Sequence, residues 1–103
     1  MDIGKLKEYS NLAQDIALTK KNALEKCKSR QIFAYNNRLF RADAQTITLT
    51  NTLKSHATTF VILDVNENPC QIEDPETFLK ILLQKNQETI NGYQQVLDKF
   101  KQK

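Results

Sequence analysis

The hydrophobic positions of the chain predict a long helix at each end and two strand-rich segments between them. From residue 2 to about residue 29, apolar side chains recur with alternating spacings of three and four, close to a heptad repeat, which indicates an amphipathic helix. The stripe contains Leu6, Tyr9, Ala13, Ile16, Lys20, Ala23 and Cys27. Lys20 is its one polar member, and Leu12 and Leu24 widen it.

A β-hairpin is predicted over residues 31–41. Two four-residue runs rich in β-branched and aromatic side chains flank Asn36-Asn37. Asn tolerates the positive φ that a tight hairpin turn requires. A two-residue turn places Phe33 opposite Phe40 on one face of the hairpin.

The segment Thr46–Leu53 is compatible with two structures. Its Thr content and its period of two favour a strand. The helical spacing of Leu49, Leu53 and Ala57 favours a helix, and Asp43 stands where its side chain can cap that helix. We expect a helix, because the cap at Asp43 and the sequence context favour it.

A second hairpin and a second capped helix follow. Residues 59–63 give a clear strand signal, residues 66–69 have turn chemistry, and residues 70–72 make a short return strand. Asp74 then repeats the position of Asp43 at a spacing of 31 residues, since each ends a hairpin and precedes a helix. The two hairpin-helix units therefore share the same order of elements and the same capping position.

The last helix is predicted over residues 75–101, with Pro75 at its first position. One face is marked by Phe78, Leu82, Ile90, Tyr93, Leu97 and Phe100, with Leu79, Leu83 and Val96 alongside. At a rise of 1.5 Å per residue this helix is about 39 Å long. That length exceeds what a core of two hairpins can cover.

Together these elements predict one α+β domain over residues 1–103. Its order is helix, β-hairpin-helix, β-hairpin-helix, with long N- and C-terminal helices (about 2–29 and 75–101) packing on a small antiparallel sheet. The near-heptad spacing of both long helices predicts a homo-oligomer. The candidate helix interface is Tyr93, Leu97 and Phe100.

The charge of the chain is polarised, although its net value is only +3. Residues 20–41 contain a basic cluster against one acid, while residues 64–76 carry five acids and no base. The cluster is Lys20, Lys21, Lys26, Lys28, Arg30, Arg38 and Arg41. Three interpretations stay open: a solvated surface, a site for phosphate backbones with Phe33 or Tyr35 for stacking, or a contact with the acidic segment of a neighbouring subunit.

No group of residues predicts catalysis, a metal or a cofactor. The single histidine is His56, and the chain has no glycine-rich phosphate loop. Cys27 and Cys70 are expected as buried free thiols, because with His56 they are too few to hold zinc. A calcium loop beginning at Asp64 would need Gly where Pro69 stands.

The order of features resembles a small family of bacteriophage and prophage proteins over residues 18–101. The residues that carry this likeness are the hairpin end Phe40-Arg41-Ala42-Asp43 and the second hairpin built on residues 60–64. That family is a domain of unknown function found in tail or tail-fibre-associated proteins. The resemblance implies a non-enzymatic structural or interaction module with phage tail proteins as partners, and it brings no catalytic residues.

The expected location is the host cytoplasm or the virion. The longest apolar run, residues 60–63, is far shorter than a membrane span, and the first residues lack the apolar segment of a signal peptide. We therefore expect no membrane partner. The alternative function is a small basic nucleic-acid-binding or regulatory protein of phage origin, which is not favoured.

Overall fold

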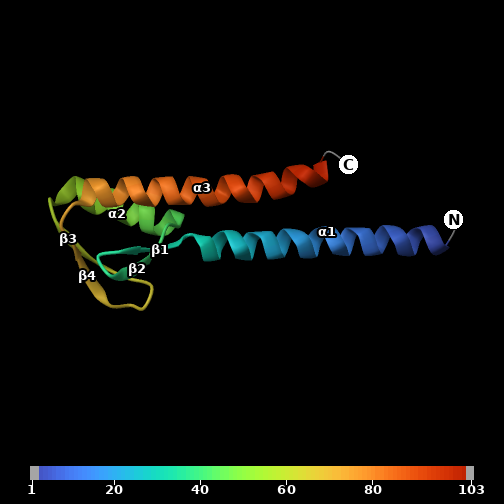
Figure 1. Ribbon diagram of the computed structural model, residues 1–103, viewed down its shortest axis with the longest axis horizontal. Coiled ribbons are helices and arrows are strands. Elements are labelled where there is room, and N and C mark those ends of the chain that lie inside the picture. The colour runs from blue at the N-terminus through green and yellow to red at the C-terminus, as the bar shows by residue number, and fades with distance from the viewer. Residues whose placement is uncertain (1–2, 102–103) are drawn as a thin grey trace.

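The computed structural model describes residues 3–101, and the side chains of residues 12–99 among them. The order of elements confirms the α+β prediction, with helices and hairpins close to the predicted bounds (Figure 1). The elements are α1 (Ile3–Arg30), β1 (Ile32–Tyr35), β2 (Arg38–Arg41), α2 (Ala44–His56), β3 (Phe60–Leu63), β4 (Pro69–Ile72) and α3 (Pro75–Lys101).

The first hairpin has the predicted register. β1 pairs antiparallel with β2, and Phe33 lies opposite Phe40. Asn36 and Asn37 have φ angles of 51° and 62°, the left-handed conformation that a two-residue hairpin turn needs at both positions. Two consecutive Asn residues therefore fix where the chain reverses.

Segment Thr46–Leu53 is helical, as capping predicted. The Asp43 carboxylate accepts a hydrogen bond of 2.8 Å from the backbone N–H of Thr46. Within the helix the hydroxyl of Thr52 donates to the carbonyl of Thr48 at 2.9 Å. The hydroxyl thus bonds back to the preceding turn, as threonine hydroxyls inside helices commonly do.

α3 begins with the same kind of N-cap, an aspartate carboxylate. Asp74 accepts hydrogen bonds from the backbone N–H of Thr77 at 3.2 Å and from its hydroxyl at 2.7 Å. These two contacts lower the pKa of the Asp74 carboxyl, the hydroxyl most of all. The predicted correspondence of Asp43 and Asp74 is thus confirmed as two N-caps.

The four strands form two separate two-stranded sheets rather than one continuous sheet. The hairpins meet where the backbone N–H of Val65 donates to the carbonyl of Leu39 at 2.9 Å. Arg38 on β2 also contacts Asp64, which follows β3, at 3.5 Å. One backbone bond and one ion pair join the hairpins without extending either ladder.

An aromatic cluster between the first hairpin and α3 forms the centre of the core. Phe40 and Phe78 are almost completely buried, and their ring centroids lie 5.0 Å apart in an edge-on arrangement. Tyr35 packs on Phe78 at 4.9 Å, and Phe33 lies 6.2 Å from it. The buried core is completed by Ala42, Phe60, Ile62, Cys70, Ile72 and Leu82.

The molecule is elongated, with a head and a stalk. Its radius of gyration is 19.3 Å, whereas a compact chain of this length has about 13 Å. We call residues 31–85 the head, and residues 12–30 of α1 with residues 86–99 of α3 the stalk. In Figure 1 the two stalk helices run antiparallel, and α1 extends past the C-terminal end of α3.

Candidate interaction surface

Small side chains bring α1 and α3 together in the stalk. Ala23 and Cys27 of α1 lie across from Thr89 and Gly92 of α3, around a hollow of about 40 Å³. A Cβ added at Gly92 would meet no atom within 4 Å. The contact between the two helices therefore includes small residues and leaves some space unfilled.

A second apolar surface on α3 lies beside this contact, about a quarter turn around the helix. Its members are Leu79, Leu83, Ile90 and Leu97, which we call the outer stripe. At 100° per residue they fall within about 40° of one another around the helix. Leu83 and Ile90 are exposed by 46% and 40%, while Leu79 and Leu97 are half-buried. The residues that face the head and α1, such as Phe78, Leu82 and Thr89, are buried instead.

The outer stripe is almost free of charge along the stalk. Between Asn86 and Leu97 the only charged side chain is that of Glu88, and amides stand at Gln87 and Gln94 beside the stripe. The neighbouring part of α1, residues 20–30, has five bases and one acid. The two helices of the stalk thus offer an apolar, neutral surface and a basic one.

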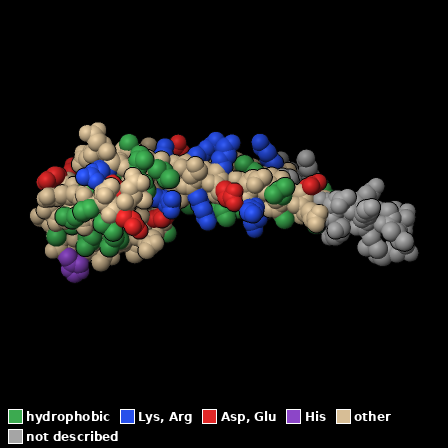
Figure 2. All heavy atoms as spheres, turned by 90° about the horizontal axis from the view of Figure 1, so that it is seen from below, with side chains coloured by type: hydrophobic (Ala, Val, Ile, Leu, Met, Phe, Trp, Pro, Cys, Tyr) green, Lys and Arg blue, Asp and Glu red, His purple; other side chains and the backbone are tan. Residues whose placement is uncertain are grey.

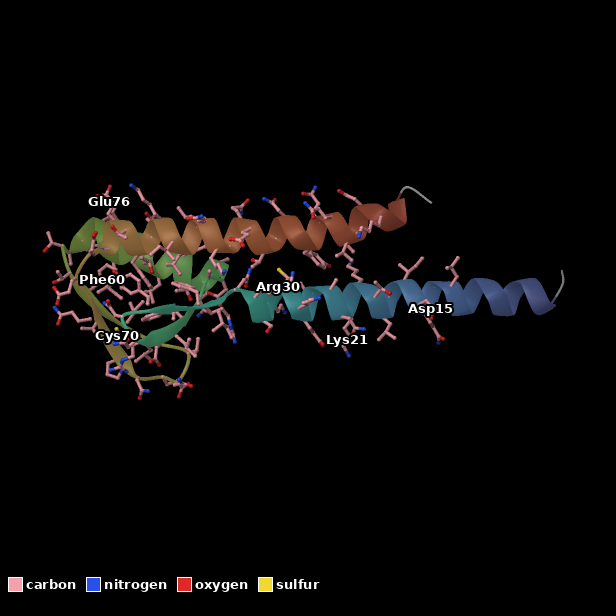
Figure 3. The ribbon with its side chains drawn as sticks, in the orientation of Figure 1. Asp15, Lys21, Arg30, Phe60, Cys70 and Glu76 are labelled. Carbon is pink, nitrogen blue, oxygen red and sulfur yellow. The ribbon has the colours of Figure 1, made fainter. Side chains whose placement is uncertain are left out.

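The structure does not gather the basic cluster into one patch. Lys21 and Lys28, seven positions apart, share one side of α1. Lys26 and Arg30 instead line the hollow beside α3. In Figure 3 Lys21 lies on the side of α1 away from α3, whereas Arg30 lies toward α3. Figure 2 shows basic side chains along both edges of the stalk. Lys20 belongs to the apolar stripe of α1.

Arg38 has a partner inside the chain. Its guanidinium lies 3.5 Å from the carboxylate of Asp64, a buried side chain. Asp64 also accepts hydrogen bonds from the backbone N–H groups of Asn66 and Asn68, at 2.8 and 2.9 Å. The pKa of Asp64 is lowered by these contacts, by the Asn68 N–H first, against the opposing effect of burial. Arg38 therefore contributes to the junction of the two hairpins.

Arg41 lies at an open polar hollow of about 400 Å³ between the two hairpins and the start of α2. The other lining residues are Phe40, Asp43, Gln45, Thr46, Leu63, Asp64, Val65 and Glu67. Asp43 and Asp64 are already engaged as a cap and in a turn. None of the residues that line the hollow is a histidine, cysteine or serine.

The aromatic side chains suggested for base stacking are partly buried and pack against the core. Tyr35 and Phe33 both pack against Phe78 and Phe40. Burial, and secondarily the charge of Asp74, raises the pKa of the Tyr35 hydroxyl. A nucleic-acid base would therefore have to displace core contacts in order to stack on either ring.

The residues of the predicted helix interface separate in the structure. Tyr93 is half-buried and lines the hollow between α1 and α3, so it contacts its own chain. Leu97 belongs to the outer stripe, and the side chain of Phe100 lies outside the described residues. Leu83 was expected only alongside the main face. The repeat of seven from Leu83 to Ile90 to Leu97 is the signal that identifies the second surface.

Other chemistry is sparse in the described part of the chain. Cys27 and Cys70 are buried free thiols, as expected, and His56 is exposed at the end of α2. No three His, Cys, Asp or Glu side chains among the described residues are placed to hold a metal ion. None of the helices, over the residues described, has the length of apolar sequence that spanning a membrane requires.

Comparison of the chain with protein-family models, with curated proteins and with solved structures finds no match.

Proposed function

We propose that this chain is a non-enzymatic structural module that acts through helix-mediated association, beginning with a second copy of itself. The observation that carries the proposal is the outer stripe of α3, where Leu83 and Ile90 are exposed by 46% and 40%. A helix of a monomeric protein normally turns its apolar side chains toward its own core. Here one apolar face of α3 meets the head and α1, and another meets solvent.

The energetics favour covering this surface. Complete burial of a Leu or Ile side chain stabilises by about 1.5–3 kcal/mol. Two copies pairing along the outer stripe would bury further surface on eight such side chains. Association has an entropic cost of roughly 4–15 kcal/mol. The two magnitudes are comparable, so an equilibrium that depends on protein concentration is expected.

The resemblance to phage tail-associated proteins supports the same class of function. A stalk joined to a small head suits a component of a larger assembly, with tail proteins as further partners and the virion or the host cytoplasm as its location. Elongation of the molecule to 66 Å along its longest axis is in keeping with such a role.

The alternative, binding to nucleic acid through the basic cluster, has weaker support. Its lysines are distributed around α1, Arg38 is paired with Asp64, and Phe33 and Tyr35 pack against the core. Titration of duplex and single-stranded DNA at two salt concentrations tests this alternative. Phosphate-driven binding would weaken steeply as salt rises, and absence of binding at low salt would eliminate it.

Light scattering across a range of protein concentrations tests the main proposal. We expect the mass to rise above the 11.9 kDa of one chain toward twice that value. A mass that stays at one chain at every concentration would refute association.

A further inference from the structure

We propose that α2 is a conformational switch. When its N-cap is released, residues 46–53 change from a helix to a β-strand and stack with the same segment of other copies. Such a switch goes beyond the proposed function, because association through α3 uses the helices as they are and needs no change of conformation.

Two neighbouring side chains of α2 are placed unfavourably in the helix. Thr50 is completely buried, yet its hydroxyl has no hydrogen-bond partner among the described residues. Leu49, the residue before it, is exposed by 47%. A buried hydroxyl without a partner destabilises the folded state, and so does an apolar side chain left in water. The helix therefore buries the polar member of this pair and exposes the apolar one.

An extended chain would reverse both placements. Successive side chains of a strand point to opposite faces, so Ile47, Leu49 and Leu53 would share one face. The other face would consist of the four threonines Thr46, Thr48, Thr50 and Thr52. Threonine and isoleucine are β-branched and favour strands, and threonines on adjacent strands can hydrogen-bond to each other. The same residues that are mismatched in the helix therefore suit a strand.

The helical state of α2 is maintained mainly from outside the segment. α2 has 13 residues, a length at which isolated helices are only marginally stable in water. Its first turn contains no acid that could interact with the helix dipole. The helix is instead held by the Asp43 carboxylate, which accepts the N–H of Thr46, and by Ile47 and Leu53, which pack against the core. Release of the cap is therefore the step that frees the segment.

The composition of the segment allows identical copies to stack. Residues 44–53 contain no Asp, Glu, Lys, Arg, Gly or Pro. Short segments with high strand propensity, low net charge and no proline are those that form stacked cross-β strands. Asn51 would interrupt the apolar face, but asparagines of successive copies can form a hydrogen-bonded ladder. The nearest charged residues, Asp43 and Lys54, stand at the two ends of the segment and do not interrupt it.

The rate of β-assembly of the full chain tests the switch. Thioflavin fluorescence is followed at a temperature just below the thermal midpoint, and fibre diffraction checks for a strand spacing of about 4.7 Å. In Asp43→Ala the missing cap should raise the exchange rate of the α2 amides roughly fivefold and shorten the lag before assembly by a similar factor. Asp43→Asn is the matched control, because asparagine also caps helices, and it should behave like the wild type.

Leu49→Lys distinguishes the strand from the helix. The position is exposed in the helix, so lysine leaves the folded protein unchanged by circular dichroism. In stacked strands the same lysine brings like charges together on the apolar face. Combined with Asp43→Ala, it should abolish assembly. Leu18→Lys in the same background is the control, because Leu18 is an exposed leucine of α1, and it should leave assembly unchanged.

Hydrogen exchange of the assembled material identifies the strand. We expect protected amides over residues 46–53. Protection of the second hairpin, residues 59–72, with residues 46–53 open would overturn the switch, and so would continued assembly of Asp43→Ala with Leu49→Lys. If Asp43→Ala does not fold, the wild type with and without Leu49→Lys gives the same comparison on heating.

These outcomes are independent of association through α3. Leu49 is not part of the outer stripe, so Leu49→Lys should leave the mass of the native protein by light scattering unchanged. A protein that associates in its native state but never forms β-assemblies would refute the switch alone. A protein that stays one chain in its native state and converts through residues 46–53 would refute only the proposed function.

Discussion

Gly92 is an unusual residue for the middle of a long helix, and its surroundings are open. Because an added Cβ meets no atom within 4 Å, Gly92→Ala introduces no clash with α1. Alanine is favoured over glycine in a helix by about 1 kcal/mol, partly because it restricts the unfolded chain. We expect the thermal midpoint to rise by roughly 4 °C. A lower midpoint, measured by calorimetry, would show that α1 approaches Gly92 more closely.

Asp64 links the stability of the head to pH. Its pKa is lower in the folded chain than in the unfolded chain, so the folded state binds fewer protons. The resulting stability is present above about pH 4 and is lost as the pH falls through the folded pKa. Asp64→Asn keeps an oxygen that accepts the N–H bonds of Asn66 and Asn68 but removes the charge that faces Arg38.

The expected result is a smaller decline of stability in acid for Asp64→Asn than for the wild type. Urea unfolding at about pH 6 and about pH 3 gives the free energy of unfolding of each protein. Asp74→Asn is a useful comparison, because the pKa of Asp74 is also lowered, by hydrogen bonds from Thr77 first and by the charge of Lys80, at the start of α3. Equal declines for the wild type and Asp64→Asn would contradict the role assigned to the carboxylate.

At the scale of elements, α2 depends strongly on its cap. Its threonines favour an extended chain, and the Asp43 carboxylate satisfies the N–H of Thr46. Asp43→Ala is expected to lower the free energy of unfolding by about 1 kcal/mol, and Asp43→Asn by less, because Asn also caps helices. Denaturant unfolding measures both. An Ala variant as stable as the wild type would mean that packing alone holds α2 in place.

Local patterns predicted most elements because their causes lie within a few residues. Asn36 and Asn37 set the hairpin register, and Asp43 and Asp74 set the starts of two helices. The division into two sheets was not predictable, since it depends on how Val65 meets Leu39 after the intervening α2. The pairing of Arg38 with Asp64 likewise joins residues that are distant in sequence.

The candidate surface was only partly predictable for a similar reason. Periodicity identified Ile90 and Leu97 as apolar positions on the last helix, but it did not show which apolar positions the chain itself would cover. Tyr93 is used inside the chain, against α1, while Leu83 is left outside. Which side of α3 remains exposed to solvent depends on where α1 and the head pack against it.

For the whole molecule, the division into head and stalk is the feature that a function has to explain. The head has a compact aromatic core around Phe40 and Phe78. Its two hairpins are joined by the ion pair between Arg38 and Asp64 of the same chain. The stalk extends beyond that core and presents apolar side chains, including Ile90, to solvent. A second copy packed along α3 would cover this surface.

The distance between spin labels on two copies tests this arrangement most directly. Asn91 is exposed next to Ile90 of the outer stripe, and the native thiols of Cys27 and Cys70 are buried, so Asn91→Cys can be labelled selectively. With helix axes about 8–10 Å apart, pulsed dipolar spectroscopy should give a distance of roughly 20 Å or less. A distance beyond about 40 Å, or no dipolar signal at concentrations where the wild type associates, would contradict packing of α3 against α3.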